Sequence, residues 1–281
     1  MKTNIEMAAD AIRAADGILI SAGAGMSIDS GLPDFRGGQG LWTAYPKLAH
    51  LNISFIDMCN PKAFKENPEL CWGWYGHRIK DYRRAIPHQG FKMLQKIAKL
   101  PSNGHYVFTS NVDGHFQKSG FDPSRIVECH GTVHKLQCTR NCKLDTWTAD
   151  DLEPVVDLYE CRWMGELPTC PHCGMLARPN VMMFSDLYYA RTESELAHAA
   201  CQEWMNTCKN IVGIEIGAGN AVPTVRWYNQ DFTTTLIRIN PTDYDSPREQ
   251  DIGIPLGGLD GITALYAALG LDKDTYDGVL A

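Results

Sequence analysis

The sequence of 281 residues predicts an α/β fold: a doubly wound, mostly parallel sheet interrupted by a small inserted module. Three observations lead to this class. Short apolar runs alternate with segments of helical period, the first of these runs leads directly into a glycine-rich turn, and one stretch rich in cysteine and proline lacks helical period. Short buried strands separated by helices are typical of parallel sheets that are covered on both faces.

The expected strands are short runs of aliphatic, β-branched and aromatic residues at 18–20, 106–109, 126–127, 211–216 and 234–239. The expected helices show apolar residues at three- and four-residue spacing, at 4–15, 68–84, 91–100, 192–208 and 259–269. The glycine turn that follows the first strand is typical of the start of a nucleotide-binding α/β unit. We therefore expect a sheet domain at 1–135 and 184–281, with the inserted module at 136–183.

The composition argues against several function classes. Lysine and arginine number 26 against 33 aspartates and glutamates, a formal net charge of −7, whereas a nucleic-acid binder needs a basic face. No apolar run reaches about 18 residues, so neither a membrane span nor a membrane partner is expected. The first 17 residues carry three acids and no long apolar core, so we expect no signal peptide and a cytoplasmic protein.

Four of the ten cysteines form two closely spaced pairs within the module. Three residues separate Cys138 from Cys142, and two separate Cys170 from Cys173. Zinc prefers four tetrahedral thiolates, and a short spacer lets one tight turn supply two of them. Two disulfides or four unrelated thiols are the alternatives, and a reducing compartment disfavours the disulfides. We expect one structural Zn²⁺ per chain, because four thiolates leave no position open for water.

The turn Gly23-Ala24-Gly25 resembles half of a dinucleotide-binding fingerprint. Its small residues would let backbone N–H groups approach a pyrophosphate, although an ordinary tight turn is the alternative. Ile28 replaces the third glycine of the fingerprint, and no acid lies about 20 residues further on. A hydride-transferring dehydrogenase of the usual kind is therefore disfavoured, whereas another NAD-using fold is not.

Seven motifs, in order along the chain, resemble those of the sirtuins, the NAD-dependent protein deacylases. The first, GAGMSIDSGLPDFRGGQGLW at 23–42, is similar to the signature GAG-x-S-x-x-S-G-I-P-D-F-R followed by GLW. The two cysteine pairs are similar to the family's zinc module. The others are SNVDG at 110–114 (similar to QNID), ECHG at 128–131 (HG), RPNVMMFSD at 178–186 (RPxVVxFGE), IGAGNAVPTV at 216–225 (GTSxxVxPA) and INPTD at 239–243 (IN). The sequence is thereby identified as resembling the bacterial-type sirtuins over nearly its whole length.

The resemblance implies a Rossmann-like NAD-binding domain and a zinc-ribbon domain, with NAD and an acylated lysine of a protein substrate meeting between them. The implied catalytic residues are His130, as general base, and Asn111. Val181 and Phe184 are implied to contact the substrate peptide. The implied NAD-binding residues are Ala22, Gly23, Ala24, Gly25, Asp34, Phe35 and Arg36 around the phosphates and nicotinamide ribose, Ser110, Asn111 and Asp113 around the nicotinamide, and Gly217, Ala218, Gly219 and Asn240 around the adenosine.

The implied reaction transfers the acyl group to ADP-ribose and releases nicotinamide. Breaking the nicotinamide–ribose bond develops positive charge on the ribose carbon, and nearby amide and carboxylate groups would assist this step. The acyl oxygen would then attack that carbon, while a histidine with a pKa near neutrality takes a ribose hydroxyl proton. His130 directly follows an expected strand, where α/β sheets place their ligands.

Tyr75 and Arg78 lie three residues apart on the helix expected at 68–84, so they would share one face. Together they offer a hydroxyl and a guanidinium fork suited to a carboxylate. The segment is similar to the FYxxR of sirtuins that accept succinyl- or malonyl-lysine. A surface arginine beside a half-buried tyrosine is the alternative, because the motif is short.

Three departures from the family pattern leave other functions open. The motif FGE becomes FSD at 184–186, the glutamine of QNID becomes Ser110, and GTS becomes GAG at 217–219. With water in place of the lysine acyl group, the protein would be an NAD glycohydrolase, and with another nucleophile an ADP-ribosyltransferase. An idle nucleotide sensor and a zinc-dependent nucleic-acid binder are further alternatives, which the retained catalytic motifs and the acidic balance argue against.

Overall fold

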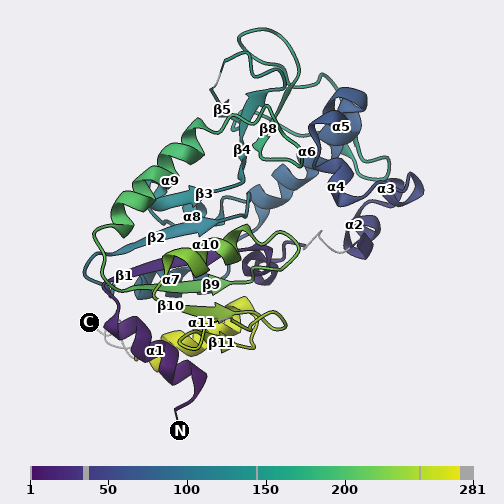
Figure 1. Cartoon of the computed structure of the whole chain (residues 1–281). Helices are drawn as coiled ribbons and strands as arrows, with labels where there is room; N and C mark the ends of the chain where they lie inside the picture. Colours follow the sequence, from purple (N-terminus) through teal and green to yellow (C-terminus); the bar gives the residue numbers. More distant parts are fainter. Residues whose placement is uncertain (1, 34–37, 144, 247, 273–281) are drawn as a thin grey trace, which may run out of the picture.

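A six-stranded parallel sheet forms the centre of the larger part of the molecule (Figure 1). The structure, a computed structural model, describes residues 2–33, 38–143, 145–246 and 248–272. The strand order is β11-β10-β9-β1-β2-β3, and every neighbouring pair is parallel. The strands are β1 (Gly17–Ala22), β2 (His105–Thr109), β3 (Ile126–Glu128), β9 (Ile211–Ile216), β10 (Thr235–Ile239) and β11 (Ile252–Ile254). The chain starts at the centre and winds first to one edge and then to the other, which confirms the doubly wound class.

Helices cover both faces of this sheet, and each face has its own apolar core. Ile18 and Ile20 of β1 lie in one core, and Leu19 between them lies in the other. This alternation follows from the pleat of a strand, in which successive side chains point to opposite faces. The helices are α1 (Asn4–Ala14), α7 (Gly90–Ile97) and α11 (Gly258–Ala268) on one face, and α9 (Thr192–Met205) and α10 (Thr224–Phe232) on the other.

A smaller part of the molecule lies beyond the edge strand β3 (Figure 1). Its strands are all antiparallel and form a sheet of order β5-β4-β8 and a separate ladder β6-β7. They are β4 (Gly131–Cys138), β5 (Trp147–Thr148), β6 (Val156–Asp157), β7 (Arg162–Trp163) and β8 (Ala177–Val181). Short helices from an earlier stretch of chain flank them: α2 (Gly38–Ala44), α3 (Pro46–His50), α4 (Phe55–Met58), α5 (Pro61–Glu66) and the longer α6 (Pro68–Arg84).

Helix α6 packs closely against this antiparallel part. A Cβ atom on Gly73 would lie only 2.2 Å from the carbonyl oxygen of Cys161, so the approach requires glycine. Trp72 and Trp74 of the same helix are fully buried in a core that also contains Trp163. The start of the helix is fixed by Asn67, whose side chain accepts from the N–H of Leu70 at 3.3 Å. This helix therefore forms a rigid wall beside the site described below.

The expected strands and helices are all present, and each observed end lies within three residues of its expected position. Sequence reasoning missed the helices α2–α5 and α10, the three-residue strand β11 and the strands β4–β8 of the antiparallel part. Most of these elements have seven residues or fewer, which is too few to show a period. The remaining described elements are the 3-10 helices η1 (Ala24–Ser30) and η2 (Pro123–Arg125) and the short α8 (His115–Lys118). No helix among the described residues has the length and apolar character to cross a membrane. The domain limits given above stay a prediction.

Candidate active site

A cavity of about 230 Å³ opens beside the carboxyl ends of β1, β2 and β3, where a parallel sheet gathers its loops. Ala24, Ser27, Ser110, Asn111, Asp113 and His130 line the part next to the sheet. Arg78 and Tyr82 of α6 line it together with Val181, Phe184 and other apolar residues. The cavity therefore brings the expected nicotinamide residues together with the expected peptide-contacting residues, although the two groups come from different sheets.

Hydrogen bonds fix the side chains next to the sheet. The Ser27 hydroxyl donates to a carboxylate oxygen of Asp113 at 2.6 Å, and the other carboxylate oxygen accepts from the backbone N–H of His115 at 2.9 Å. The amide of Asn111 donates to the carbonyl of Gly23 at 2.9 Å and lies 3.4 Å from the Ser27 hydroxyl. The polar end of the cavity is therefore set in place by contacts within the protein. Ser27 was not singled out from the sequence, although it belongs to the first motif.

His130 lies at the junction between the two sheets. It follows β3, and its carbonyl accepts a hydrogen bond of 2.9 Å from the N–H of Met182, just after β8. The next residue, Gly131, has φ of +73°, and a Cβ there would lie 2.0 Å from the carbonyl oxygen of Asn180. The glycine after this histidine thus permits a sharp turn and a close approach, and the turn leaves His130 on the cavity wall.

The glycine turn after β1 packs against the loop after β9. A Cβ on Gly25 would lie 2.6 Å from the Cα of Gly217, and one on Gly23 would lie 2.7 Å from the Cα of Ala218. The N–H of Gly25 also donates to the carbonyl of Gly217 at 3.0 Å. In this turn the small residues therefore serve the contact between two loops. The expected approach of a pyrophosphate stays a prediction.

The residues expected at the adenosine half lie at the carboxyl ends of β9 and β10. The side chain of Asn240 donates to the carbonyl of Ala218 at 3.1 Å and accepts from the N–H of Asp243 at 3.0 Å. It therefore links two loops. Ala22 is the last residue of β1, and Gly219 belongs to the loop of Ala218. The remaining expected cofactor residues, Asp34, Phe35 and Arg36, lie outside the described residues.

Arg78 reaches the cavity, but its nearest hydroxyl partner is Tyr82 and not Tyr75. The Arg78 Nε donates to the Tyr82 hydroxyl at 2.9 Å, and its guanidinium lies 4.6 Å from the centre of the Trp74 ring. Tyr75 is fully buried outside the cavity lining, with its hydroxyl 3.9 Å from the sulfur of Cys59, and burial raises its pKa. The expected neighbours do lie together, with the guanidinium 5.9 Å from the centre of the Tyr75 ring, but the hydroxyl beside it comes from Tyr82, four residues further along the same helix face. Arg78 is 8% exposed, so the surface-arginine alternative does not hold either.

The FSD segment at 184–186 is held by a buried ion pair. The carboxylate of Asp186 lies 2.7 Å from a guanidinium nitrogen of Arg178, and both side chains are 1% exposed. The same carboxylate accepts from the N–H groups of Met183 and Tyr188. Replacing glutamate by aspartate therefore keeps an acid in place beside the cavity. Phe184, at the edge of the segment, is 38% exposed, whereas Val181 is buried.

The four expected cysteines meet in the antiparallel part, where Cys138 ends β4. The sulfurs of Cys138, Cys142, Cys170 and Cys173 all lie within 4.8 Å of one another. The distances from Cys138 to Cys173 and from Cys142 to Cys170 are both 3.6 Å. Four sulfurs about 2.3 Å from one zinc ion would lie about 3.8 Å apart at tetrahedral corners, so the set fits Zn²⁺. All ten cysteines are free thiols, which excludes the disulfide alternative.

Fold and cavity together define an α/β protein of the nucleotide-binding class with an attached four-cysteine metal module. The Sir2 family model matches residues 23–217. An NAD-dependent protein deacylase of Aeropyrum pernix is 30% identical over 254 residues, covering 89% of this chain and 91% of the relative. One of Pyrococcus furiosus is 33% identical over 177 residues, covering 63% of each chain. The chain therefore belongs to the Sir2 family, which confirms the resemblance found in the sequence.

Solved structures agree with this assignment at the level of the fold. The crystal structure of a Sir2 homologue–NAD complex covers 94% of this chain and 93% of its own, with a TM-score of 0.69 and 21% identity. A Sir2 homologue mutant–ADP-ribose complex covers 98% of each chain, with a TM-score of 0.71 and 20% identity. The chain therefore shares the overall fold of these structures.

Proposed function

We propose that this protein is an NAD-dependent protein-lysine deacylase, which transfers an acyl group from lysine to ADP-ribose and releases nicotinamide. One observation carries the proposal: Asn111, Asp113 and His130 line the same cavity as Val181 and Phe184. A polar end made of an amide, a carboxylate and an imidazole thus meets a largely apolar wall that suits an acyl chain. Family membership and the names of the two relatives support the same activity.

Each side chain has a role in this proposal that follows from its chemistry. Asn111 and Asp113, held by Ser27, offer a polar surface to the nicotinamide as it leaves. The apolar wall excludes water, so that the acyl oxygen attacks the ribose carbon. His130 takes a proton from a ribose hydroxyl, because an imidazole exchanges protons near neutral pH.

The experiment is to incubate the protein with NAD, with and without an acyl-lysine peptide, and to identify the products. Peptide-dependent O-acyl-ADP-ribose supports the proposal. Peptide-independent ADP-ribose would instead make the protein an NAD glycohydrolase, and ADP-ribose attached to a protein would make it an ADP-ribosyltransferase. Absence of nicotinamide release would contradict all three.

The proposed role of Zn²⁺ at the four cysteines is structural. Four thiolates fill a tetrahedral shell, and none of these cysteines lines the cavity. The ion would hold the turns at Cys142 and Cys173 to the strands of the antiparallel part. A cytoplasmic location belongs to the proposal, and it is supported by the ten cysteines, none of which is in a disulfide, because oxidising compartments favour disulfides.

We extend the proposal to acidic acyl chains such as succinyl- or malonyl-lysine. Arg78 is a buried cation on the cavity wall, and a guanidinium next to the Tyr82 hydroxyl suits a carboxylate. Replacing Arg78 by Met should lower kcat/KM for succinyl-lysine at least about tenfold and change that for acetyl-lysine much less. Both values come from the same peptide carrying either acyl group. Equal losses on the two peptides would reject this extension and leave the deacylase proposal intact.

A further inference from the structure

We propose that Arg226 is a positioning residue for NAD: it fastens together the two loops that hold the adenosine half and so determines the affinity for NAD. This inference rests on the proposed function, because NAD must bind at the loops after β9 and β10. Arg226 does not line the cavity. No motif found in the sequence assigns it a contact with NAD.

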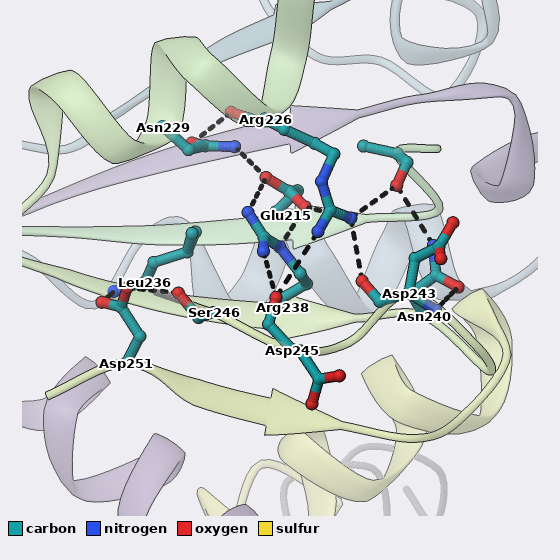
Figure 2. A network of polar contacts seen from close by, with 12 residues as sticks. Glu215, Arg226, Asn229, Leu236, Arg238, Asn240, Asp243, Asp245, Ser246 and Asp251 are labelled. Atoms are coloured by element: carbon teal, nitrogen blue, oxygen red, sulfur yellow. Dashed lines mark hydrogen bonds and ion pairs between the residues drawn. The ribbon is translucent and has the colours of Figure 1, made fainter. Parts of the chain in front are cut away.

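Figure 2 shows a buried charge network beneath these loops. The carboxylate of Glu215, on β9, lies between two guanidinium groups, 2.6 Å from Arg238 Nε and 3.8 Å from Arg226 Nη1. Asn229 of α10 donates to the same carboxylate at 3.0 Å. Glu215 is fully buried, Arg238 is 1% exposed and Arg226 is 8% exposed. Buried charges require partners, so the geometry of this network is tightly restricted.

The guanidinium of Arg226 binds backbone carbonyl groups on both loops. Its Nη1 donates to the carbonyl of Ala218 at 3.1 Å and to that of Asp243 at 2.8 Å. Its Nη2 donates to the carbonyl of Asp245 at 3.4 Å. Ala218 lies after β9. Asp243 and Asp245, which Figure 2 labels, lie after β10. Arg226 therefore spans both loops, whereas Asn240 also donates to the carbonyl of Ala218 and Arg238 to that of Asp245.

The composition of the first loop makes the spacing of the two loops important. Residues 217–219 are Gly-Ala-Gly, where the family pattern has Thr and Ser hydroxyls. Within this segment only backbone groups are polar, and the first polar side chain of the loop is that of Asn220, so the position of the backbone contributes strongly to the affinity. Arg226 suits the task, because a planar guanidinium offers several donors in a fixed fork, whereas an alkyl chain of similar length offers none.

Arg248 provides a matched control. It too is a partly buried arginine that joins segments through backbone carbonyls, donating to those of Thr233 at 2.6 Å and Gln230 at 3.2 Å. It also binds the carboxylate of Asp251 at 2.8 Å. Its carbonyl partners precede β10, so they lie at the opposite end of the strands from the proposed adenosine loops. A purely structural role predicts similar behaviour for the two arginines.

The test compares Arg226→Met, Arg226→Lys and Arg248→Met with the unmodified protein. The measurements are the Kd for ADP-ribose by calorimetry, KM for NAD and for acyl peptide, kcat, and Tm. We expect Arg226→Met to raise Kd and KM for NAD about tenfold or more, with kcat and KM for peptide within about twofold. Arg226→Lys should recover part of the loss, because an ammonium can replace one nitrogen of the fork. Arg248→Met should lower Tm and leave Kd within about twofold.

The inference is overturned if Arg226→Met leaves Kd unchanged, or if Arg248→Met raises Kd equally. Should Arg226→Met fail to fold, Arg226→Lys decides, because a Kd equal to that of the unmodified protein would contradict the need for a fork. Failure of the unmodified protein to bind ADP-ribose would instead contradict the proposed function itself. A defect in the unmodified protein thus contradicts the proposed function, whereas normal binding by the Arg226 variants contradicts only the role of Arg226.

Discussion

The two halves of the proposed NAD site are built differently. The nicotinamide half presents functional side chains, and Asn111, Asp113 and His130 all line one cavity. The adenosine half is a pair of loops, and the segment 217–219 that opens the first of them carries no polar side chain. Its shape depends on Arg226 and on Asn240, whose donors are directed at the backbone of the loops.

This difference separates chemistry from positioning. A half-site made of side chains loses a defined chemical step when one side chain is removed. A half-site made of backbone binds its ligand more weakly when the side chain that positions the backbone is removed, whereas kcat of the bound complex stays the same. The two halves touch at Gly25 and Gly217, so a change at that contact should affect both.

The largest expected effect tests the nicotinamide half. Replacing His130 by Ala should lower the rate of acyl transfer by about a hundred- to ten-thousandfold, because it removes the general base. The Kd for ADP-ribose should stay within about threefold of the unmodified value, in contrast to Arg226→Met. Acyl transfer is measured with saturating NAD and peptide, and Kd by calorimetry.

A His130→Asn variant serves as the control for lost volume, since an amide fills part of the space of the ring but does not act as a base. Both variants should be inactive and equally folded. Full acyl transfer in either variant would remove His130 as the base. A large rise in the Kd for ADP-ribose would show that the two halves are not separable in this way.

The sequence predicts the side-chain half far better than the backbone half. Asn111 and His130, whose roles the resemblance to the sirtuins implies, each lie two residues after a strand, and the carboxyl ends of parallel strands converge on one edge. The four cysteines could be predicted for a similar reason, because metal chemistry dictates their spacing. In both cases a local pattern carries the information.

The residues that sequence reasoning missed depend on packing between distant segments. Tyr82 partners Arg78 only because the rotation of α6 directs one face at the cavity, and a helical period alone does not show which of two tyrosines lies there. Arg226 lies in α10, a nine-residue helix that is not among the helices expected from the sequence. Its partners follow β9 and β10, so its role appears only after the strands are ordered.

An intermediate effect is expected at the contact between the halves. In Gly25→Ala, the new methyl group would lie 2.6 Å from the Cα of Gly217. The atoms that it meets all belong to the backbone of Gly217, so they cannot rotate away. Overpacking of this kind costs about 1–3 kcal/mol. We expect a lower free energy of unfolding in urea together with a higher Kd for ADP-ribose.

The matched control is Gly257→Ala, since a Cβ on Gly257 meets no atom within 4 Å. Its free energy of unfolding should change by less than about 1 kcal/mol, the scale of a helix cap, and Kd should not change. Equal effects of the two substitutions would show that the contact between Gly25 and Gly217 does not couple the halves.

The smallest expected effect concerns pH and a carboxyl group next to the nicotinamide half. Glu128 ends β3, two residues before His130, and burial raises its pKa to about 7. An unfolded glutamate titrates near about 4.3, so between these values the folded state binds more protons than the unfolded state. Ionisation of Glu128 therefore lowers the stability of the protein as pH rises from about 4.3 through 7. Glu128→Gln removes this penalty. The difference in free energy of unfolding between this variant and the unmodified protein should therefore grow in favour of the variant by about 1 kcal/mol between pH 5 and pH 8. The value is smaller than the full pKa shift would give, because residual solvent access screens the charge.

Glu193→Gln gives the opposite sign and so checks the reasoning. Burial opposes ionisation of Glu193, but hydrogen bonds from Lys135 and Thr146 outweigh it and lower its pKa. Its ionised form therefore stabilises the folded state, and the contribution is present above the unfolded pKa and lost as pH falls through the folded pKa. Glu193→Gln should then have a lower free energy of unfolding than the unmodified protein at pH 8, and this difference should shrink toward acid pH. Urea unfolding at pH 5 and pH 8 measures it. If the free energies of unfolding of the two variants change with pH in parallel, the carboxyl group of Glu128 does not have the raised pKa given above. The end of β3 then holds no group that titrates near neutral pH.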